Sequence, residues 1–170
     1  MRISTFRSAI FTLATATALT LVAAAPAKAQ TADVPQVGVG VNIMSIYEQT
    51  AFGLNVDLAK TVKPVGNGLK MGLVGDLGVN WFEGATQTSF AGGLRFTTTT
   101  TTSMPFYFQF LLGAVHVPGA TELLLMPGGG VKFAINEQTT AKVQLDLPMN
   151  IGEFKTWTGL RIGGGIVFEF

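Results

Sequence analysis

The 170-residue chain contains no cysteine, a single histidine and few charged residues. Without cysteine it has neither a disulfide framework nor a site for a lipoprotein anchor. No group of residues has the spacing of metal ligands, and no glycine-rich loop leads into a helix that would hold a phosphate. Lysine and arginine are scattered and form no basic patch for a nucleic acid. We therefore expect no cofactor, no metal and no nucleic-acid partner.

The first 29 residues read as a targeting segment. Arg2 and Arg7 give a positive start, the uncharged apolar stretch "AIFTLATATALTLVAAA" follows, and "AKA" at 27–29 offers small residues to a signal peptidase. An uncleaved membrane anchor is the alternative, which the short, Thr-rich apolar core and the small-residue site disfavour. We predict a secretory signal peptide over 1–29 and one mature domain over 30–170.

Loss of this segment changes the charge balance. The chain has 11 Lys+Arg and 10 Asp+Glu; without Arg2, Arg7 and Lys28, 8 basic and 10 acidic residues remain, a net charge of −2. These charges are about 13% of the mature chain, against about 25% in an average soluble domain. No mature segment reaches the roughly 20 continuous apolar residues of a membrane-spanning helix. The mature chain is thus apolar and poor in charge without being a helical membrane protein.

Apolar and polar residues alternate along most of the mature chain. Clear examples are "AKVQLDLPM" at 141–149, "AFGLNVDLA" at 51–59 and "LKMGLVGDLGVNW" at 69–81. A period of two is typical of β-strands with two different faces. Glycine, proline and asparagine mark the breaks between these runs.

Eight runs result, joined by short connections. They cover 37–47, 51–61, 69–81, 88–98, 105–116, 122–135, 139–149 and 156–170. Short connections between consecutive strands indicate an antiparallel meander, and closure of the meander removes the exposed edges that promote aggregation. The sequence predicts an all-β fold: an eight-stranded, antiparallel, up-and-down β-barrel.

The residues of the polar face indicate which side of the barrel is inside. That face carries many glycines, which suit the crowded interior of a small barrel better than a water-exposed surface. Its charges nearly balance, as buried charges must, whereas the apolar face has almost none and suits lipid. We predict a lumen charge network of Asp57, Lys70, Asp76, Arg95, Lys132, Lys142, Asp146, Arg161 and Glu169. The alternative is a soluble, lipocalin-like periplasmic barrel with its apolar face inside.

Aromatic residues gather near the expected strand ends. One rim would hold Tyr47, Phe52, Trp81, Phe82, Phe90 and Phe154; the other would hold Phe96, Phe106, Phe133, Phe168 and Phe170. Two aromatic girdles are typical of transmembrane β-barrels. The pattern favours a transmembrane barrel with lipid as its surroundings.

The chain ends in "GIVFEF", which sets Gly165, Phe168 and Phe170 in the spacing G-x-x-F-x-F. This ending resembles the C-terminal signal by which the outer-membrane assembly machinery recognises bacterial β-barrels. Gly163 stands where a polar residue is usual in that signal. We take Gly165, Phe168 and Phe170 as the expected assembly signal and the assembly machinery as an expected partner.

The mature chain as a whole resembles the small eight-stranded outer-membrane proteins, such as the membrane domain of outer membrane protein A, outer membrane protein X and the opacity-type surface proteins. The resemblance implies a monomeric barrel in the bacterial outer membrane with both termini in the periplasm. The connections near 48–50, 82–87, 117–121 and 150–155 would then face outward. Their shortness argues against an adhesive role, which longer loops carry in this family.

The sequence supports more than one interpretation of the function. A structural or surface barrel with a charge-plugged lumen is the first interpretation, and a narrow pore or a small-ligand-carrying barrel is the second. Some barrels of this size are enzymes that modify lipid A, but His116 has only Glu122 near it in sequence, and Ser45, Ser89 and Ser103 lie in other strands or at the opposite rim. We expect no catalytic residues. Pro127 predicts a bulge or kink in the sixth strand, and Trp157 falls on the parity opposite to the lipid face.

Overall fold

A computed structural model describes residues 34–66, 68–99 and 104–170. The predicted signal peptide, 1–29, lies outside the described residues, as does Ser103. The strands are β1 Pro35–Ile46, β2 Gln49–Gly66, β3 Leu69–Phe82, β4 Ala85–Thr98, β5 Phe106–Val117, β6 Ala120–Ala134, β7 Thr139–Asp146, β8 Met149–Ile151, β9 Thr156–Thr158 and β10 Leu160–Glu169. Among these residues, none forms a helix long and apolar enough to cross a membrane.

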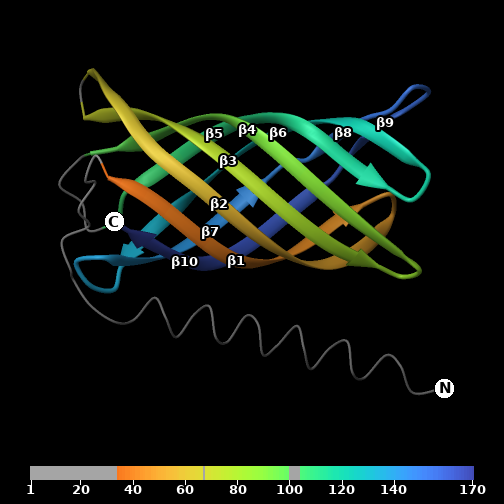
Figure 1. Ribbon diagram of the computed structural model, residues 1–170, viewed down its shortest axis with the longest axis horizontal. Helices are drawn as coiled ribbons and strands as arrows, with labels where there is room; N and C mark the ends of the chain where they lie inside the picture. Colours follow the sequence, from red (N-terminus) through yellow and green to blue (C-terminus); the bar gives the residue numbers. More distant parts are fainter. Residues whose placement is uncertain (1–33, 67, 100–103) are drawn as a thin grey trace, which may run out of the picture.

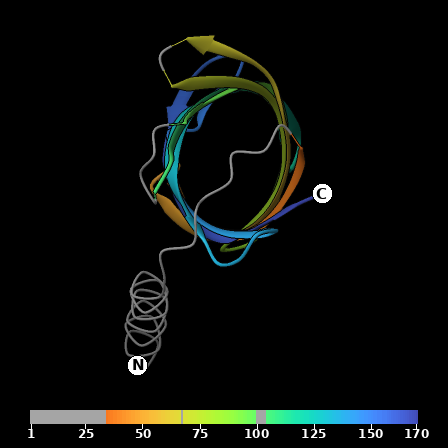
Figure 2. The same cartoon turned by 90° about the vertical axis from the view of Figure 1, so that its left-hand side faces the viewer.

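The strands form one closed antiparallel sheet (Figures 1 and 2). Sequential strands pair from β1 to β6, β7 lies between β6 and β10, and β10 returns to β1 with Gln36 opposite Glu169. Seen along its axis, the sheet encloses a ring without a free edge (Figure 2). Closure of this kind removes unpaired strand edges. The predicted up-and-down barrel is confirmed.

The ten labelled strands make a ring of eight. β7 and β8 are one path along β6, since the register Gly128↔Asp146 continues as Leu125↔Met149 without a shift. Pro148 interrupts this path because proline has no N–H to donate. β9 and β10 likewise form one path, joined where the Gly159 N–H donates to the Pro148 carbonyl at 2.8 Å. The eight predicted runs match these eight paths.

Two details of the strands were predicted wrongly. Pro127 makes no bulge against β5, because the register runs unbroken from Phe106↔Val131 to Val117↔Ala120. The Pro127 carbonyl accepts from the Leu147 N–H at 2.9 Å. The N–H that Pro127 lacks would point to the same side, toward the gap between β7 and β8, where no strand hydrogen bond is lost. β2 runs beyond residue 61 to Gly66, and its bulges lie at Thr61/Lys63 and Pro64/Gly66 instead.

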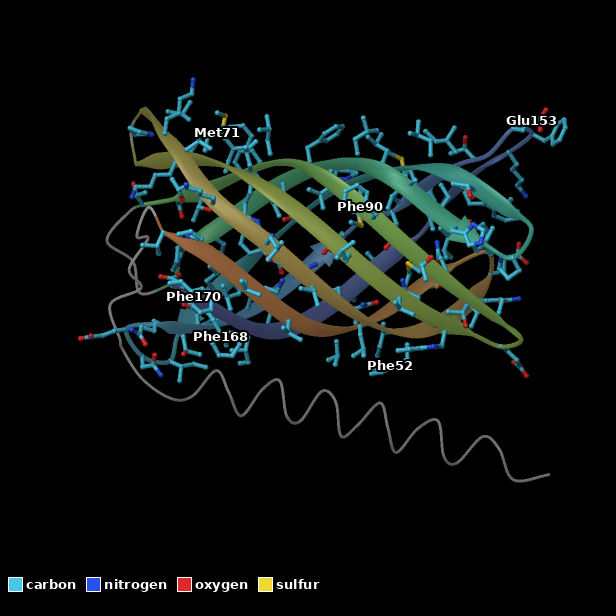
Figure 3. All side chains as sticks on the ribbon, in the orientation of Figure 1. Phe52, Met71, Phe90, Glu153, Phe168 and Phe170 are labelled. Carbon is cyan, nitrogen blue, oxygen red and sulfur yellow. The ribbon has the colours of Figure 1, made fainter. Side chains whose placement is uncertain are left out.

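The apolar face of the strands is outside. In β1, Val39 and Val41 are each 49% exposed, whereas Gly38, Gly40 and Asn42 between and beside them are buried. The same alternation continues in β2, where Phe52 and Leu54 face outward (Figure 3). An apolar exterior of this extent suits hydrocarbon and is the reverse of a soluble lipocalin-like barrel. That alternative is therefore wrong.

The interior holds an apolar part that the sequence did not predict. Val74, Ala91, Leu111, Val115, Leu124 and Met126 form a buried cluster inside the wall made by β3 to β6. Leu124 and Met126 point inward while Leu123 is exposed, so β6 keeps the period of two through "LLLM". The interior is thus partly packed core and partly polar.

Candidate functional site

The first part of the polar interior is built around Asp57 of β2. Its Oδ2 accepts from the Arg95 guanidinium of β4 at 3.2 Å, and its Oδ1 pairs with the Lys142 ammonium of β7. Gly38 of β1 faces Asp57, and a Cβ at that glycine would overlap the carboxylate. The glycine therefore gives the carboxylate the space it needs between two cations.

The second part is built around Arg161 of β10. Its Nη1 donates to Asp76 Oδ1 of β3 at 3.0 Å, and its Nε donates to Asp146 Oδ2 of β7 at 2.9 Å. A Cβ at Gly128 of β6 would overlap the Asp146 carboxylate, just as a Cβ at Gly38 would overlap the Asp57 carboxylate. One guanidinium thus bridges two carboxylates that come from opposite sides of the barrel wall.

Gln109 of β5 joins the two parts. Its Oε1 accepts from Arg95 Nε at 3.0 Å and from Nη2 at 2.7 Å, and its Nε2 donates to Asp146 Oδ1 at 3.1 Å. We call the six charged residues the charged layer: Asp57, Asp76, Arg95, Lys142, Asp146 and Arg161. All six are at most 4% exposed. Three cations meet three carboxylates, so the layer is neutral, as a group of buried charges must be.

The other three residues of the predicted network lie nearer the end where Pro35 and Phe170 sit, which we call the terminal end. Lys132 of β6 is buried, and its Nζ donates to Gln36 Oε1 at 2.7 Å. Gln36 Nε2 in turn donates to Glu169 Oε1 at 2.9 Å, so an amide joins the two charges. Lys70 is half-buried. The structure therefore brings six of the nine together and sets three apart.

A small cavity lies among these three residues. It measures about 20 Å³ and is lined by residues that include Gln36, Lys70, Arg95, Lys132 and Glu169. Space of this size holds about one water molecule, for which 10–15 Å³ is the lower limit. The terminal end is thus hollowed, but the hollow does not amount to a wide aqueous channel.

A second polar cluster closes the opposite end. Tyr47, in the two-residue turn between β1 and β2, donates its hydroxyl to Glu122 Oε2 at 2.9 Å and accepts from the Asn150 side-chain amide. Its ring packs edge-on against Phe82, at 6.4 Å between centroids, and Trp157, at 5.0 Å. We call these five residues the Tyr47 cap. Burial raises the pKa of Tyr47 to about 12, and the Glu122 carboxylate adds to the rise.

The cap corrects two expectations and accounts for the parity of Trp157. Tyr47 and Phe82 were predicted at the lipid-facing rim, yet the Tyr47 ring contacts both Phe82 and Trp157 within the cap. The reason for Tyr47 is the left-handed turn: its φ is 56° and that of Glu48 is 59°, as in the tight turns that glycine and asparagine favour. Trp157, which did not fit the lipid face, has its place here.

Glu122 does not orient His116. In the hairpin of β5 and β6, Val115 lies opposite Glu122 and His116 lies opposite Thr121, so the two side chains are on different faces. The exposed His116 ring instead has its Nδ1 3.0 Å from Thr121 Oγ1. Within the described residues, no three His, Asp or Glu side chains are grouped to hold a metal ion. No catalytic arrangement emerges from these residues.

Sequence reasoning missed the neutral side chains of the polar interior. Gln36 and Gln109 connect charges. Gln144 connects Asp146 to Tyr107, whose hydroxyl donates to Gln144 Oε1 at 3.2 Å. The Tyr107 ring also lies under Arg95, whose Cζ is 4.7 Å from its centroid. Their inward parity was readable in the sequence, since each alternates with outward apolar residues. Charge predicts only the charged members of the network, and these uncharged links carry no charge.

No family model and no curated protein sequence matches the chain. Solved structures do match. Neisserial surface protein A (NspA) is 13% identical with a TM-score of 0.59, over 80% of this chain and 96% of that one. The outer membrane enzyme PagL is 13% identical with a TM-score of 0.58, over 75% and 97%. Ail, the attachment invasion locus protein of Yersinia pestis, is 12% identical with a TM-score of 0.51, over 81% and 100%.

At these identities the likeness concerns the fold. The chain has the architecture of the small eight-stranded outer-membrane β-barrels, as its C-terminal motif and alternation predicted. The predicted location, the bacterial outer membrane, agrees with this architecture and with the apolar exterior. Proteins of this fold include both a surface protein and an enzyme, so fold alone does not select the function.

Proposed function

We propose that the protein is a bacterial outer-membrane barrel with a structural or surface role whose lumen is closed by the charged layer. The observation that carries the proposal is the neutral set of six buried charges, held on both sides of the barrel by four direct ion pairs. An eight-stranded barrel leaves an interior just wide enough for side chains to fill. Large paired side chains at this point would interrupt a continuous path for ions.

The remaining parts of the proposal concern assembly. We propose that residues 1–29 direct export, and that Gly165, Phe168 and Phe170 serve as the signal for the assembly machinery. Phe168 is exposed on the outer face of β10, which closes the barrel against β1, and Phe170 is 74% exposed at its end (Figure 3). Before the barrel closes, a last strand with exposed aromatic rings would offer the machinery both an unpaired edge and side chains. We propose a monomer surrounded by outer-membrane lipid.

The test is single-channel recording on purified, refolded protein in a planar bilayer. The charged layer predicts a silent membrane under conditions in which folded barrel is demonstrably inserted. A variant with both Arg95→Ala and Arg161→Ala keeps the wall but removes the two bridging side chains, and it should admit ions if its fold is retained. Regular conductance steps from the unaltered protein would reject the closed lumen and favour the narrow-pore alternative.

An enzymatic role receives no support from the described residues. His116 is on the outer face of β5 with Thr121, and Ser45 is on the outer face of β1. A Ser-His-acid mechanism requires these groups within hydrogen-bonding reach of each other. The small-ligand alternative has one specific observation in its favour, the cavity at the terminal end.

A further inference from the structure

The outer wall of the barrel carries two cations at the terminal end. Among the strand residues that the structure describes, Lys60 and Lys63 of β2 are the only lysine, arginine, aspartate or glutamate side chains on the lipid-facing side. Lys60 continues the outward alternation of Val56 and Leu58. Lys63 lies opposite Met71, which points away from the wall in Figure 3. A lysine is tolerated near the surface of a bilayer and not at its midplane, so the two lysines mark where the headgroups begin.

Neither ammonium has a hydrogen bond or an ion pair within the described residues. Lys60 lies between Pro35 of β1 and Leu73 of β3, so no carboxylate is directly across the sheet from it. The uncharged residue opposite Lys63 offers none either. Glu137, an exposed carboxylate at this end, lies in the turn between β6 and β7, and β1 and β10 separate β7 from β2. The part of the wall around the two lysines therefore leaves their charge uncompensated.

Exposed apolar side chains surround the two ammonium groups. Leu58 is 55% exposed, Val62 is 56% exposed and Val65 is 49% exposed. β2 reaches Gly66 through two bulges, and a bulge bends a strand and increases its twist. The tip of the β2–β3 hairpin stands above the outline of the other strands at the left of Figure 1. Cations among exposed apolar side chains suit the boundary between hydrocarbon and headgroups, where the stem of a lysine lies along the apolar part and its ammonium reaches the polar part.

We infer that the terminal end of the β2–β3 hairpin binds anionic phospholipids of the adjacent leaflet, with the Lys60 and Lys63 ammonium groups donating to the headgroup phosphate. Val62 and Val65 then lie at the level where the acyl chains begin. An ammonium only donates and a phosphodiester oxygen only accepts, so the two groups are complementary in charge and in hydrogen bonding. The inference rests on the part of the proposed function that surrounds the barrel with lipid, and it does not depend on a closed lumen.

The test is native mass spectrometry of the refolded barrel in an uncharged detergent, with phosphatidylglycerol or phosphatidylcholine of the same chain length added. Both lipids carry a phosphate, but the choline group cancels its charge in phosphatidylcholine. The unaltered barrel should retain phosphatidylglycerol in preference to phosphatidylcholine. Lys60→Gln and Lys63→Gln should each weaken the binding of phosphatidylglycerol about fivefold, and the double variant should weaken it about 25-fold.

Lys155→Gln is the matched control. It removes the same charge from an exposed lysine in the hairpin of β8 and β9 at the other end, where the ammonium lies 3.6 Å from the centre of the Trp157 ring. This variant should bind phosphatidylglycerol as the unaltered protein does. In detergent without phospholipid, Lys60→Gln and Lys63→Gln should unfold at the temperature of the unaltered barrel, because their ammonium groups have no protein partner to lose. A loss of lipid binding then reports the contact and not the fold.

Two results would overturn the inference. One is equal retention of the two lipids by the unaltered barrel, a result that does not depend on the folding of any variant. The other is a preference for phosphatidylglycerol that the folded double variant keeps. The lumen is tested separately by conductance. A silent barrel without the preference overturns the headgroup site and leaves the closed lumen intact, whereas a conducting barrel with the preference does the reverse.

Discussion

At the scale of single residues, Arg161 is the side chain on which the charged layer depends most. It holds Asp76 and Asp146, which come from β3 and β7, so its removal leaves two buried carboxylates without their cation. Breaking a buried pair by removing one partner costs about 3–5 kcal/mol. Arg161→Gln should therefore lower the unfolding temperature in detergent clearly.

The control for this variant is Lys63→Gln, an exposed change expected to stay within about 0.5 kcal/mol. Arg161→Lys should fall between the two, because lysine keeps the charge but cannot reach both carboxylates with a planar fork. An unchanged unfolding temperature for Arg161→Gln would mean that the layer does not stabilise the barrel.

A second prediction at this scale concerns the titration of the Tyr47 phenol. Its pKa of about 12, against an ordinary value of 10.0, means that the folded barrel holds the phenol proton more tightly than the unfolded chain does. The resulting stability is complete below pH 10 and is lost as the pH rises through about 12. The chain has only two tyrosines, so the phenolate absorbance of a Tyr107→Phe variant reports Tyr47 alone. A titration midpoint at 10 would contradict the buried cap.

At the scale of the strands, two neighbouring glycines of β4 provide a matched pair. A Cβ on Gly93, which faces inward, would overlap the Phe110 carbonyl of β5, whereas the nearest atom to a Cβ on Gly92 is the Val74 carbonyl oxygen at 3.7 Å. Gly93→Ala should destabilise the barrel by about 1–3 kcal/mol through overpacking. Gly92→Ala should be tolerated. Unfolding by urea distinguishes the two, and equal midpoints would show that β4 and β5 do not approach as closely as described.

A prediction about assembly concerns Phe170, the residue that follows the last strand. Phe170 ends the chain after β10, its N–H donates to the Pro35 carbonyl at 3.1 Å, and its ring is exposed. Phe170→Ala should reduce the folded fraction in the outer membrane while leaving refolding in detergent largely unaffected. Phe154→Ala is the control, because Phe154 is equally aromatic and more exposed but lies in the hairpin of β8 and β9 at the other end. Normal assembly of Phe170→Ala would remove the signal interpretation.

The strands were predictable where one rule governed them. Alternation and turn residues located all eight paths and the outer face, because a period of two is preserved wherever one face meets lipid and the other an interior. β2 was predicted too short because Pro64 and Gly66 are usual turn residues, and only the pairing with β3 reveals the bulges that admit them. Pro127 was misjudged because the gap it faces lies in another strand, between β7 and β8.

The site was predictable in its composition and less so in its connections. Inward parity and balanced charge selected the members of the charged layer. Parity does not reveal which cation meets which carboxylate, since partners such as Lys142 and Asp57 are 85 residues apart in the chain. The inward position of the Tyr47 ring could not be predicted from the sequence for another reason. Its left-handed backbone is uncommon for any residue other than glycine, asparagine or aspartate.

At the scale of the whole molecule, the two ends of the barrel differ. One end carries the Tyr47 cap, drawn from β1, β3, β6, β8 and β9 and their turns, with Glu153 at the tip of the β8–β9 hairpin (Figures 1 and 3). The terminal end carries the cavity and its cations. The charged layer lies between them. The two ends of the barrel therefore differ in their side chains although the wall between them is continuous.

The measurement that tests the account most directly is cell fractionation followed by gel electrophoresis of heated and unheated samples. An apolar exterior around a closed, charge-paired ring predicts that the protein is found in the outer membrane and that the unheated form migrates as a compact barrel. Heating should shift it to the mobility of the unfolded chain. A soluble periplasmic protein with no heat-dependent shift would contradict the central claim, which is that the apolar face of the strands points outward.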